Sequence, residues 1–168
     1  MRNATVIFLA QMLLVCLVAQ ANHALAGAHV YLFVGGLVIT YSALMLPGQA
    51  GLAASFLVGC ACDAAAPIPF GTQALLFATA HTIVFHLRDR LPRDDTAGRV
   101  IIALLANLGL FLALSFFLIG RSPAPSAAWP RLFADLVASQ VFLALIAPWF
   151  FALEERALEL IRPFTRWR

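Results

Sequence analysis

The sequence contains no lysine and few charged residues of any kind. Only 11% of its 168 residues are charged, and all eleven basic residues are arginines. Soluble domains carry about 25% charged residues, so this composition excludes an ordinary soluble protein. Apolar residues make up 62% of the chain, and its mean hydropathy is +0.91. We therefore predict an integral membrane protein. The basic pI of about 9.1 indicates arginines beside a membrane rather than a nucleic-acid groove.

The patterns that usually carry catalysis or bind metals are also missing from the sequence. There is no Walker phosphate loop, no G-x-S-x-G and no pair of carboxylates at mid-membrane. Cys60 and Cys62 are too close together for the common zinc spacing. His81 and His86 are five residues apart and so do not share one face of a helix. We therefore predict no catalytic, cofactor or metal site, and a protein that is not an enzyme.

Apolar segments separated by Pro, Gly and Arg divide the chain into candidate spans. We predict one transmembrane domain over residues 1–168, an all-α bundle of six transmembrane helices with a cytoplasmic tail. The predicted segments are about 4–21, 28–46, 51–66, 70–87, 100–120 and 132–153, with the tail at 154–168. Pro148 predicts a kink in the sixth span. Ala24-Leu25-Ala26 resembles a signal-peptide cleavage site, so a cleaved leader is the alternative for the first span.

The arginines are distributed unequally between the two sides of this bundle. With a cytoplasmic N-terminus and six spans, nine arginines are cytoplasmic, and only Arg121 and Arg131 lie outside. Arginine is enriched in cytoplasmic loops, so the split predicts that both termini are cytoplasmic. Arg131 and Asp135 are four residues apart at the outer start of the sixth span, where this spacing permits a local ion pair.

Asp63 is the only charged side chain between residues 2 and 88. Gly51, Ser55 and Gly59 precede it at intervals of four residues, which places all four on one stripe of a helix. Small residues at this spacing let a second helix approach closely in lipid, and an aspartate facing lipid would cost about 2.5–3.5 kcal/mol. We expect this stripe to serve partner contact or helix locking. The alternative is a packing helix in which Asp63 merely caps a neighbour.

The next span carries a similar repeat and should pack on the third span as a hairpin. Its four-spaced residues are Ala74, Ala78, Thr82 and His86. Asp63 lies about thirteen residues, or about 20 Å, from the start of the third span, beside the first turn of the fourth. The backbone N–H groups of Gly71-Thr72-Gln73 are therefore its expected partners, since the first N–H groups of a helix have no partner within it.

These residues resemble a known family. Gly59-x-x-x-Asp63 followed by Gly71, after a span ending in TYSALMLPG and before an arginine-rich loop, resembles the rod shape-determining protein MreD family. Nearly the whole chain agrees in length, span count and charge layout, although the specific motif is short. The resemblance implies a non-enzymatic scaffold of the bacterial cell-elongation complex in the inner membrane, supporting cell shape and peptidoglycan synthesis. The implied partners are MreC, the elongation synthase (RodA and its penicillin-binding transpeptidase), indirectly MreB, and membrane lipids, but no nucleic acid.

The fold that the resemblance implies is similar to the S components of energy-coupling-factor transporters, and this provides an alternative function. The chain would then be a small-ligand-binding membrane subunit of a transporter. S components are expected to show an Ala-x-x-x-Ala face in the first span. The alanines of the first span are Ala4, Ala10, Ala19 and Ala21. No two of them are four apart, which favours the scaffold. A membrane enzyme of lipid metabolism would need paired acidic residues, whereas the spans offer only Asp63.

Overall fold

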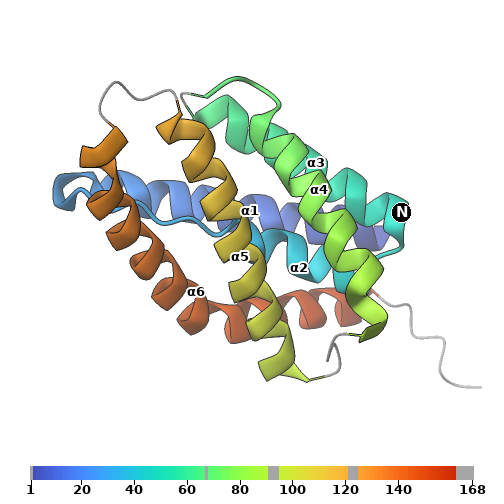
Figure 1. Cartoon of the computed structure of the whole chain (residues 1–168). Coiled ribbons are helices and arrows are strands. Elements are labelled where there is room, and N and C mark those ends of the chain that lie inside the picture. Colours follow the sequence, from blue (N-terminus) through green and yellow to red (C-terminus); the bar gives the residue numbers. More distant parts are fainter. Residues whose placement is uncertain (1, 67, 91–94, 121–124, 162–168) are drawn as a thin grey trace, which may run out of the picture.

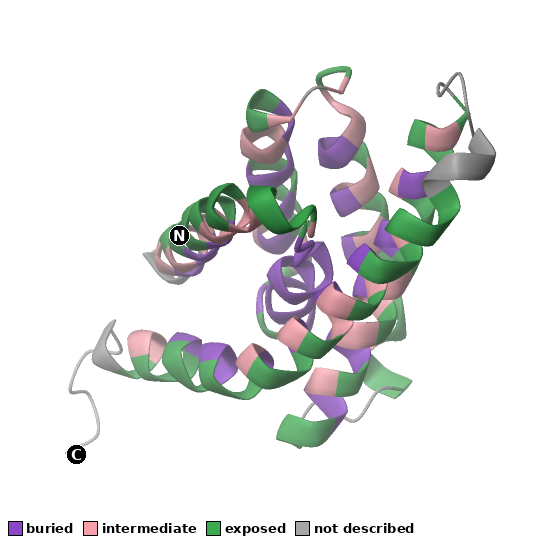
Figure 2. Ribbon diagram, turned by 90° about the vertical axis from the view of Figure 1, so that its left-hand side faces the viewer, coloured by how far each residue is buried: buried purple, intermediate pink, exposed green. Residues whose placement is uncertain are grey.

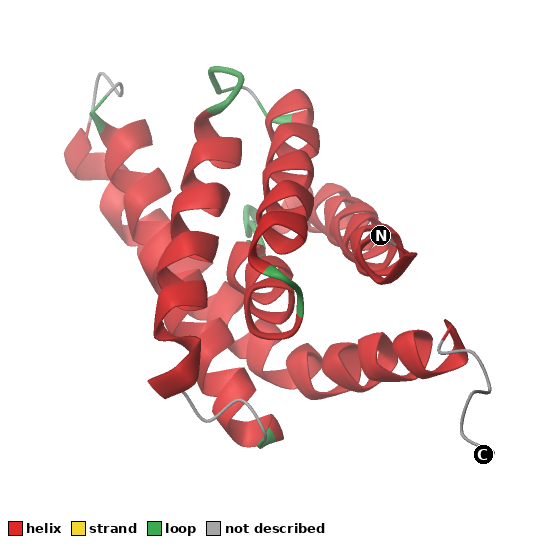
Figure 3. Cartoon of the chain, turned by 90° about the vertical axis from the view of Figure 1, so that its right-hand side faces the viewer, coloured by secondary structure: helices red, strands yellow, loops and turns green. Residues whose placement is uncertain are grey.

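The computed structural model describes residues 2–66, 68–90, 95–120 and 125–161. Within these residues the chain is helical and contains no strand, which confirms the all-α prediction (Figure 3). The helices are α1 (Arg2–Leu25), α2 (Gly35–Met45), α3 (Gly48–Ala65), α4 (Thr72–Leu87), α5 (Thr96–Ile119) and α6 (Pro125–Ile161), with two short 3-10 turns, η1 (Ala26–Ala28) and η2 (Arg88–Arg90) (Figure 1).

Three stretches of helix are long and apolar enough to cross a membrane. They are Thr5–Ala28, Thr96–Ile119 and Trp129–Glu159. The other helices are shorter, with 11 residues in α2, 18 in α3 and 16 in α4. These three stretches agree with the membrane class that the composition predicts. A total of six spans stays a prediction.

Several polar side chains are buried beside the apolar core, and many large apolar side chains are exposed, which is unusual for a soluble protein. Leu9, Leu13 and Leu17 lie on successive turns of α1, and each is more than half exposed. The fully buried side chains include Gln11 and Asn107. Polar residues are mostly exposed in soluble proteins, and large exposed apolar patches mark contact with membrane or protein. Hydrocarbon around the bundle accounts for both observations.

α2 lies at the centre of the bundle and is the purple helix in the middle of Figure 2. Every residue from Gly35 to Leu44 is buried. The helix crosses α5 with the two backbones in contact. A Cβ added to Gly36 would lie 2.2 Å from the Asn107 N atom and 2.4 Å from the Ala103 O atom. Only glycine fits at this crossing.

The predicted span at 28–46 is helical only in its second half, and this part of the six-helix prediction is wrong. α1 continues past residue 21 to Leu25 and is followed by η1. His29 then takes a left-handed conformation with φ of 55°, and residues 30–34 form no helix. We call residues 30–34 the extended segment. The chain can leave the helix here because side chains of three other helices bond its backbone groups.

α3 and α4 form the most extensive contact between any two helices of the described chain. The α3 stripe faces inward as predicted, with Gly51, Ser55, Gly59 and Asp63 all buried. The buried face of α4 is different from the predicted one and consists of Ala74, Phe77, His81 and Val84, together with Gln73. Ala78 is only half-buried, and Thr82 and His86 are exposed.

A strict four-residue repeat drifts around a helix that has 3.6 residues per turn. A face that contacts another helix follows alternating steps of three and four residues. The predicted α4 stripe uses steps of four only, so its residues after Ala74 drift away from the contact. The α3 stripe stays buried in spite of the same drift, since α1, α2 and α4 all contact α3. Gly51 leaves the space that the His81 ring occupies, and a Cβ there would lie 2.6 Å from the ring's Nε2 atom.

α6 is the longest helix, with 37 residues, and contains Pro130 and Pro148. Figure 1 shows it changing direction before its red C-terminal part, in agreement with the kink predicted at Pro148, since proline lacks an N–H and clashes with the preceding turn. The helix continues to Ile161. The rest of the predicted tail, 162–168, lies outside the described residues.

Gly59→Ala should destabilise the protein, because the new Cβ would lie 2.5 Å from the Ala74 Cα atom and 2.8 Å from the Ala74 N atom. Overpacking of this kind costs about 1–3 kcal/mol. Gly109→Ala is the matched control, since Gly109 is also helical and a Cβ there meets nothing within 4 Å. The control should be neutral or gain up to about 1 kcal/mol. Unfolding of the purified variants in detergent measures both effects, and equal stability of the two variants would contradict the close α3–α4 packing.

Candidate functional site

Asp63 lies near the C-terminal end of α3, and its carboxylate caps the N-terminus of α4. The Oδ2 atom accepts hydrogen bonds from the Gly71 N–H at 2.9 Å and the Ala74 N–H at 3.1 Å. The Oδ1 atom accepts the Gln73 N–H at 2.8 Å. The side chain is only 3% exposed. The expected bonds to Gly71 and Gln73 are therefore confirmed, and Ala74 supplies a third.

α4 needs a cap from elsewhere because its own N-cap residue is Gly71, which has no side chain. Gly71 adopts φ of 96°, a conformation that favours glycine. The remaining N–H of the first turn, on Thr72, donates to the Pro69 carbonyl at 3.2 Å. The prediction that Thr72 also bonds Asp63 is therefore wrong. In an apolar environment each of these donors requires a partner, and the positive end of the helix dipole favours a carboxylate. Together these bonds fix the turn between the two helices.

The rest of the α3 stripe packs against α2 and α4. Ser55 and Ser42 of α2 share a hydrogen bond between their hydroxyl oxygens at 2.9 Å. Gly51 packs between the Ser42 carbonyl and the His81 ring, and a Cβ there would lie 2.7 Å from the carbonyl oxygen. Gly59 touches the first turn of α4, where Asp63 bonds. The predicted residues thus lie along the inward face of the hairpin, with Ser55 bonded to α2 and the others contacting α4 or its first turn. We call Gly51, Ser55, Gly59, Asp63 and Gly71 the α3–α4 lock.

A second polar cluster holds the extended segment, and the sequence did not predict it. Asn22 of α1 bonds Leu32 twice, accepting its N–H at 2.7 Å and donating to its carbonyl at 2.9 Å. Asn107 of α5 donates to the Phe33 carbonyl at 3.1 Å and accepts the Gly36 N–H at 3.0 Å. The two amides therefore replace the hydrogen bonds that a helix would have formed.

α6 contributes a carboxylate and a hydroxyl to the same cluster. The Asp135 Oδ1 atom accepts the Tyr31 N–H at 2.9 Å. The Ser139 hydroxyl oxygen accepts the Phe33 N–H at 2.9 Å, and the hydroxyl donates to the Asp135 carbonyl at 2.6 Å. Asp135 is buried. We call Asn22, Asn107, Asp135 and Ser139 the polar clamp.

The proposed local pair between Arg131 and Asp135 is not what the structure shows. Asp135 turns inward to the backbone of the extended segment, and Arg131 is exposed. The physical reason is that a buried N–H without a partner is costly, whereas an ion pair at an exposed interface contributes little.

Glu154 is a further buried acid that the sequence placed in the cytoplasmic tail. It is 1% exposed and lies on α6 beyond Pro148. Neither of its carboxylate oxygens has a hydrogen-bond partner within the described part of the chain. Its neighbour Glu155 instead pairs with the buried guanidinium of Arg99 at the start of α5. Glu154 is therefore part of the core rather than of a solvated tail, whereas Glu155 and Arg156 after it are exposed.

Single polar residues inside apolar spans were the available signal for the polar clamp. Asn107 lies alone in a long apolar stretch, and Ser139 with its neighbour Gln140 interrupts another. Such residues usually face the interior of a bundle. Nothing in the local sequence, however, indicates which backbone groups they bond.

The side chains of these two clusters hold backbone groups in place. All three hydrogen bonds of Asp63 go to backbone donors, and the polar clamp is likewise bonded to backbone. Among the described residues no three His, Cys, Asp or Glu side chains lie close enough together to hold a metal ion. Comparison with protein-family models, curated proteins and solved structures gives no match for this chain. The hydrogen bonds at both clusters therefore position helices and the extended segment.

Asp63→Ala should destabilise the protein more than Asp63→Asn. Alanine leaves three N–H groups unmet, and each buried unmet group costs about 1–3 kcal/mol. Asparagine has one carbonyl oxygen, so it can retain the Gly71 and Ala74 bonds. Its amide NH2 group then faces the Gln73 N–H, and two donors cannot bond each other. The same unfolding assay should rank the parent above Asn and Asn above Ala. If Asn is as damaging as Ala, the negative charge matters beyond the cap. If both match the parent, the cap does not hold the hairpin.

Proposed function

We propose that this chain is a non-enzymatic scaffold of the bacterial cell-elongation complex, similar to MreD. The observation that carries the proposal is the α3–α4 lock. Gly59, Asp63 and Gly71 are the residues on which the resemblance depends, and they meet in one interaction. Asp63 accepts the Gly71 N–H, and Gly59 packs on the Ala74 backbone that Asp63 also bonds. Three motif residues that act in the same interaction support a shared fold better than three matching residues with separate roles would.

The proposed partners are MreC and the elongation synthase, with an indirect link to MreB. The scaffold role is supported by how the polar side chains are used. Both carboxylate oxygens of Asp63 accept hydrogen bonds from backbone N–H groups. This buried charge therefore holds α3 and α4 together. A scaffold needs a rigid helical surface for its partners, and the lock and the polar clamp supply that rigidity.

We also propose six membrane crossings with both termini on the cytoplasmic side of the inner membrane. α3 and α4 measure about 27 and 24 Å at 1.5 Å per residue, close to the hydrocarbon thickness of about 30 Å. The extended segment and α2 together make one crossing, since five extended residues add about 16 Å and eleven helical ones about 16 Å. The nine-to-two distribution of arginines gives the orientation.

Reporter fusions test this topology. A fusion after Arg99 and one at the C-terminus should both report cytoplasm, while a fusion in the turn after Pro67 should report the outside. A periplasmic signal at either of the first two positions would reject six crossings with cytoplasmic termini. A tag at the N-terminus separates the cleaved-leader alternative, because cleavage removes the tag and leaves the C-terminus in place.

Co-purification from native membranes tests the function itself. The tagged chain should retain MreC and the elongation synthase, identified by mass spectrometry. Asp63→Ala should reduce their recovery, because it loosens the hairpin. Leu105→Ala is the control, since Leu105 is a 64% exposed side chain on α5 outside the lock. Recovery of a transporter ATPase instead of these partners would favour the ligand-binding alternative and refute the scaffold.

A further inference from the structure

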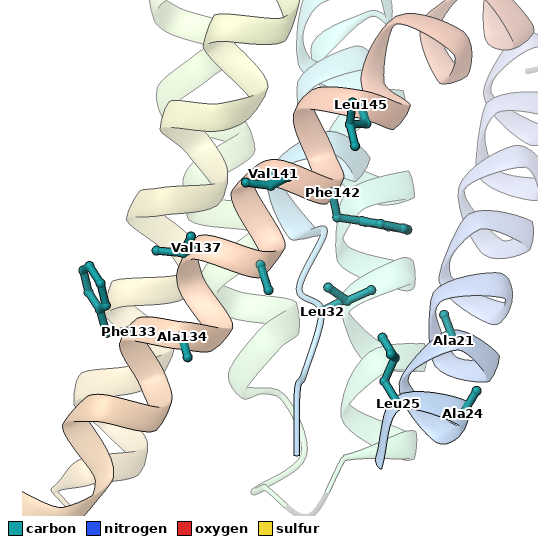
Figure 4. Close-up of a pocket in the computed structure, with 11 residues that line it drawn as sticks. Ala21, Ala24, Leu25, Leu32, Phe133, Ala134, Val137, Val141, Phe142 and Leu145 are labelled. Carbon is teal, nitrogen blue, oxygen red and sulfur yellow. The ribbon is translucent and has the colours of Figure 1, made fainter. Parts of the chain in front are cut away.

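A groove of about 960 Å³ opens on the outside of the bundle between the end of α1 and α6 (Figure 4). One wall is the last turn of α1, with Ala21, Ala24 and Leu25, and the other is α6 from Phe133 to Leu145. Leu32 of the extended segment forms the floor between them. All of the lining side chains are apolar. We call this hollow the α1–α6 groove.

We propose that the α1–α6 groove binds an acyl chain of an anionic membrane phospholipid, and that Arg131 binds the phosphate of its headgroup. The proposal is independent of the scaffold function. It rests on the position of Arg131, the length of the groove and the apolar lining.

Arg131 continues the groove wall at one end. Arg131, Ala134, Ala138, Val141 and Leu145 follow one another in steps of three and four, so they share one face of α6. Arg131 is exposed, and the carboxylate of Asp135 is turned away towards the Tyr31 N–H. The guanidinium is therefore available to a phosphate, which it binds as a planar fork of donors.

Trp129 marks the same end as the membrane interface. Its ring is 45% exposed and meets Phe116 of α5 edge-on, with 5.8 Å between ring centroids. Tryptophan concentrates at the headgroup level of a bilayer. A positive side chain at that level and an apolar groove below it match the two parts of a phospholipid.

The length of the groove favours a lipid chain over a partner's transmembrane helix. From Phe133 to Leu145, the ends of the α6 wall, is twelve residues, or about 18 Å along the helix, which is a little more than one leaflet of a 30 Å hydrocarbon core. α1 supplies a wall only at its last turn. A second helix would run the full thickness of the membrane and would find a matching wall over only about half of it.

Native mass spectrometry of the protein after reconstitution tests the proposal. The chain is placed in nanodiscs with equal amounts of phosphatidylglycerol and phosphatidylcholine and is then extracted into mild detergent. Phosphatidylglycerol should remain bound in preference to phosphatidylcholine. Arg131→Gln should reduce this preference about fivefold, the effect of roughly one basic residue beside an anionic headgroup.

Filling the groove should displace the lipid without changing the headgroup site. Ala134→Phe and, from the opposite wall, Ala24→Phe should each lower the retention of both lipids, and both positions are exposed, so a larger side chain need not disturb the core. Ala113→Phe, at an exposed position on α5, is the control and should retain lipid like the parent. Helix content by circular dichroism identifies any variant that fails to fold.

Three results would overturn the proposal. They are recovery of the parent free of lipid, groove-filling variants that bind as much lipid as the control, and an Arg131→Gln variant that keeps the full preference for phosphatidylglycerol. Loss of a co-purified protein from Ala134→Phe, with lipid binding unchanged, would assign the groove to a partner helix instead.

Discussion

The structure depends on one constraint, which is that every backbone N–H and C=O group inside an apolar environment needs a hydrogen-bond partner. A continuous helix satisfies this internally, but the described helices are broken by the extended segment within the bundle and by the turn before α4 at its edge. Each break is repaired by side chains of other helices. Asp63 bonds three N–H groups of α4, and the polar clamp bonds residues 31–36. Asp63 and the polar clamp are thus explained by the backbone groups that they bond.

The two repairs differ in how much of the chain they require. Asp63 bonds residues only eight to eleven positions later, so α3 and α4 can form their lock as a local hairpin. Asp135 and Ser139 lie 104 and 106 positions from their partners. The extended segment is therefore held in full only once α6 has packed. Contacts between neighbours in sequence form with a smaller loss of chain entropy, so the lock should be complete before the clamp.

This difference also explains what the sequence could predict. The membrane class, the inward α3 stripe and the capping by Asp63 followed from composition and from the unpaired N–H groups of a nearby helix start. The break at 30–34 did not, because locally it is only an apolar run, and its partners are spread over α1, α5 and α6. The α4 face was wrong for a simpler reason, since His81 rather than Thr82 continues a 3.6-residue period from Ala74.

The break in the second span also creates the α1–α6 groove. Residues 30–34 follow a single extended path of backbone, whereas a helix with side chains is about 10–12 Å wide. A helix over residues 30–34 would occupy the space between α1 and α6 that the groove leaves open. Side chains of an extended segment alternate between its faces. Leu32 accordingly forms the floor of the groove, while Phe33 turns to the core and meets Phe77 and Phe111 edge-on. Asn22 of the polar clamp bonds the Leu32 backbone, and so the side chains that satisfy this segment also hold Leu32 in the floor of the groove.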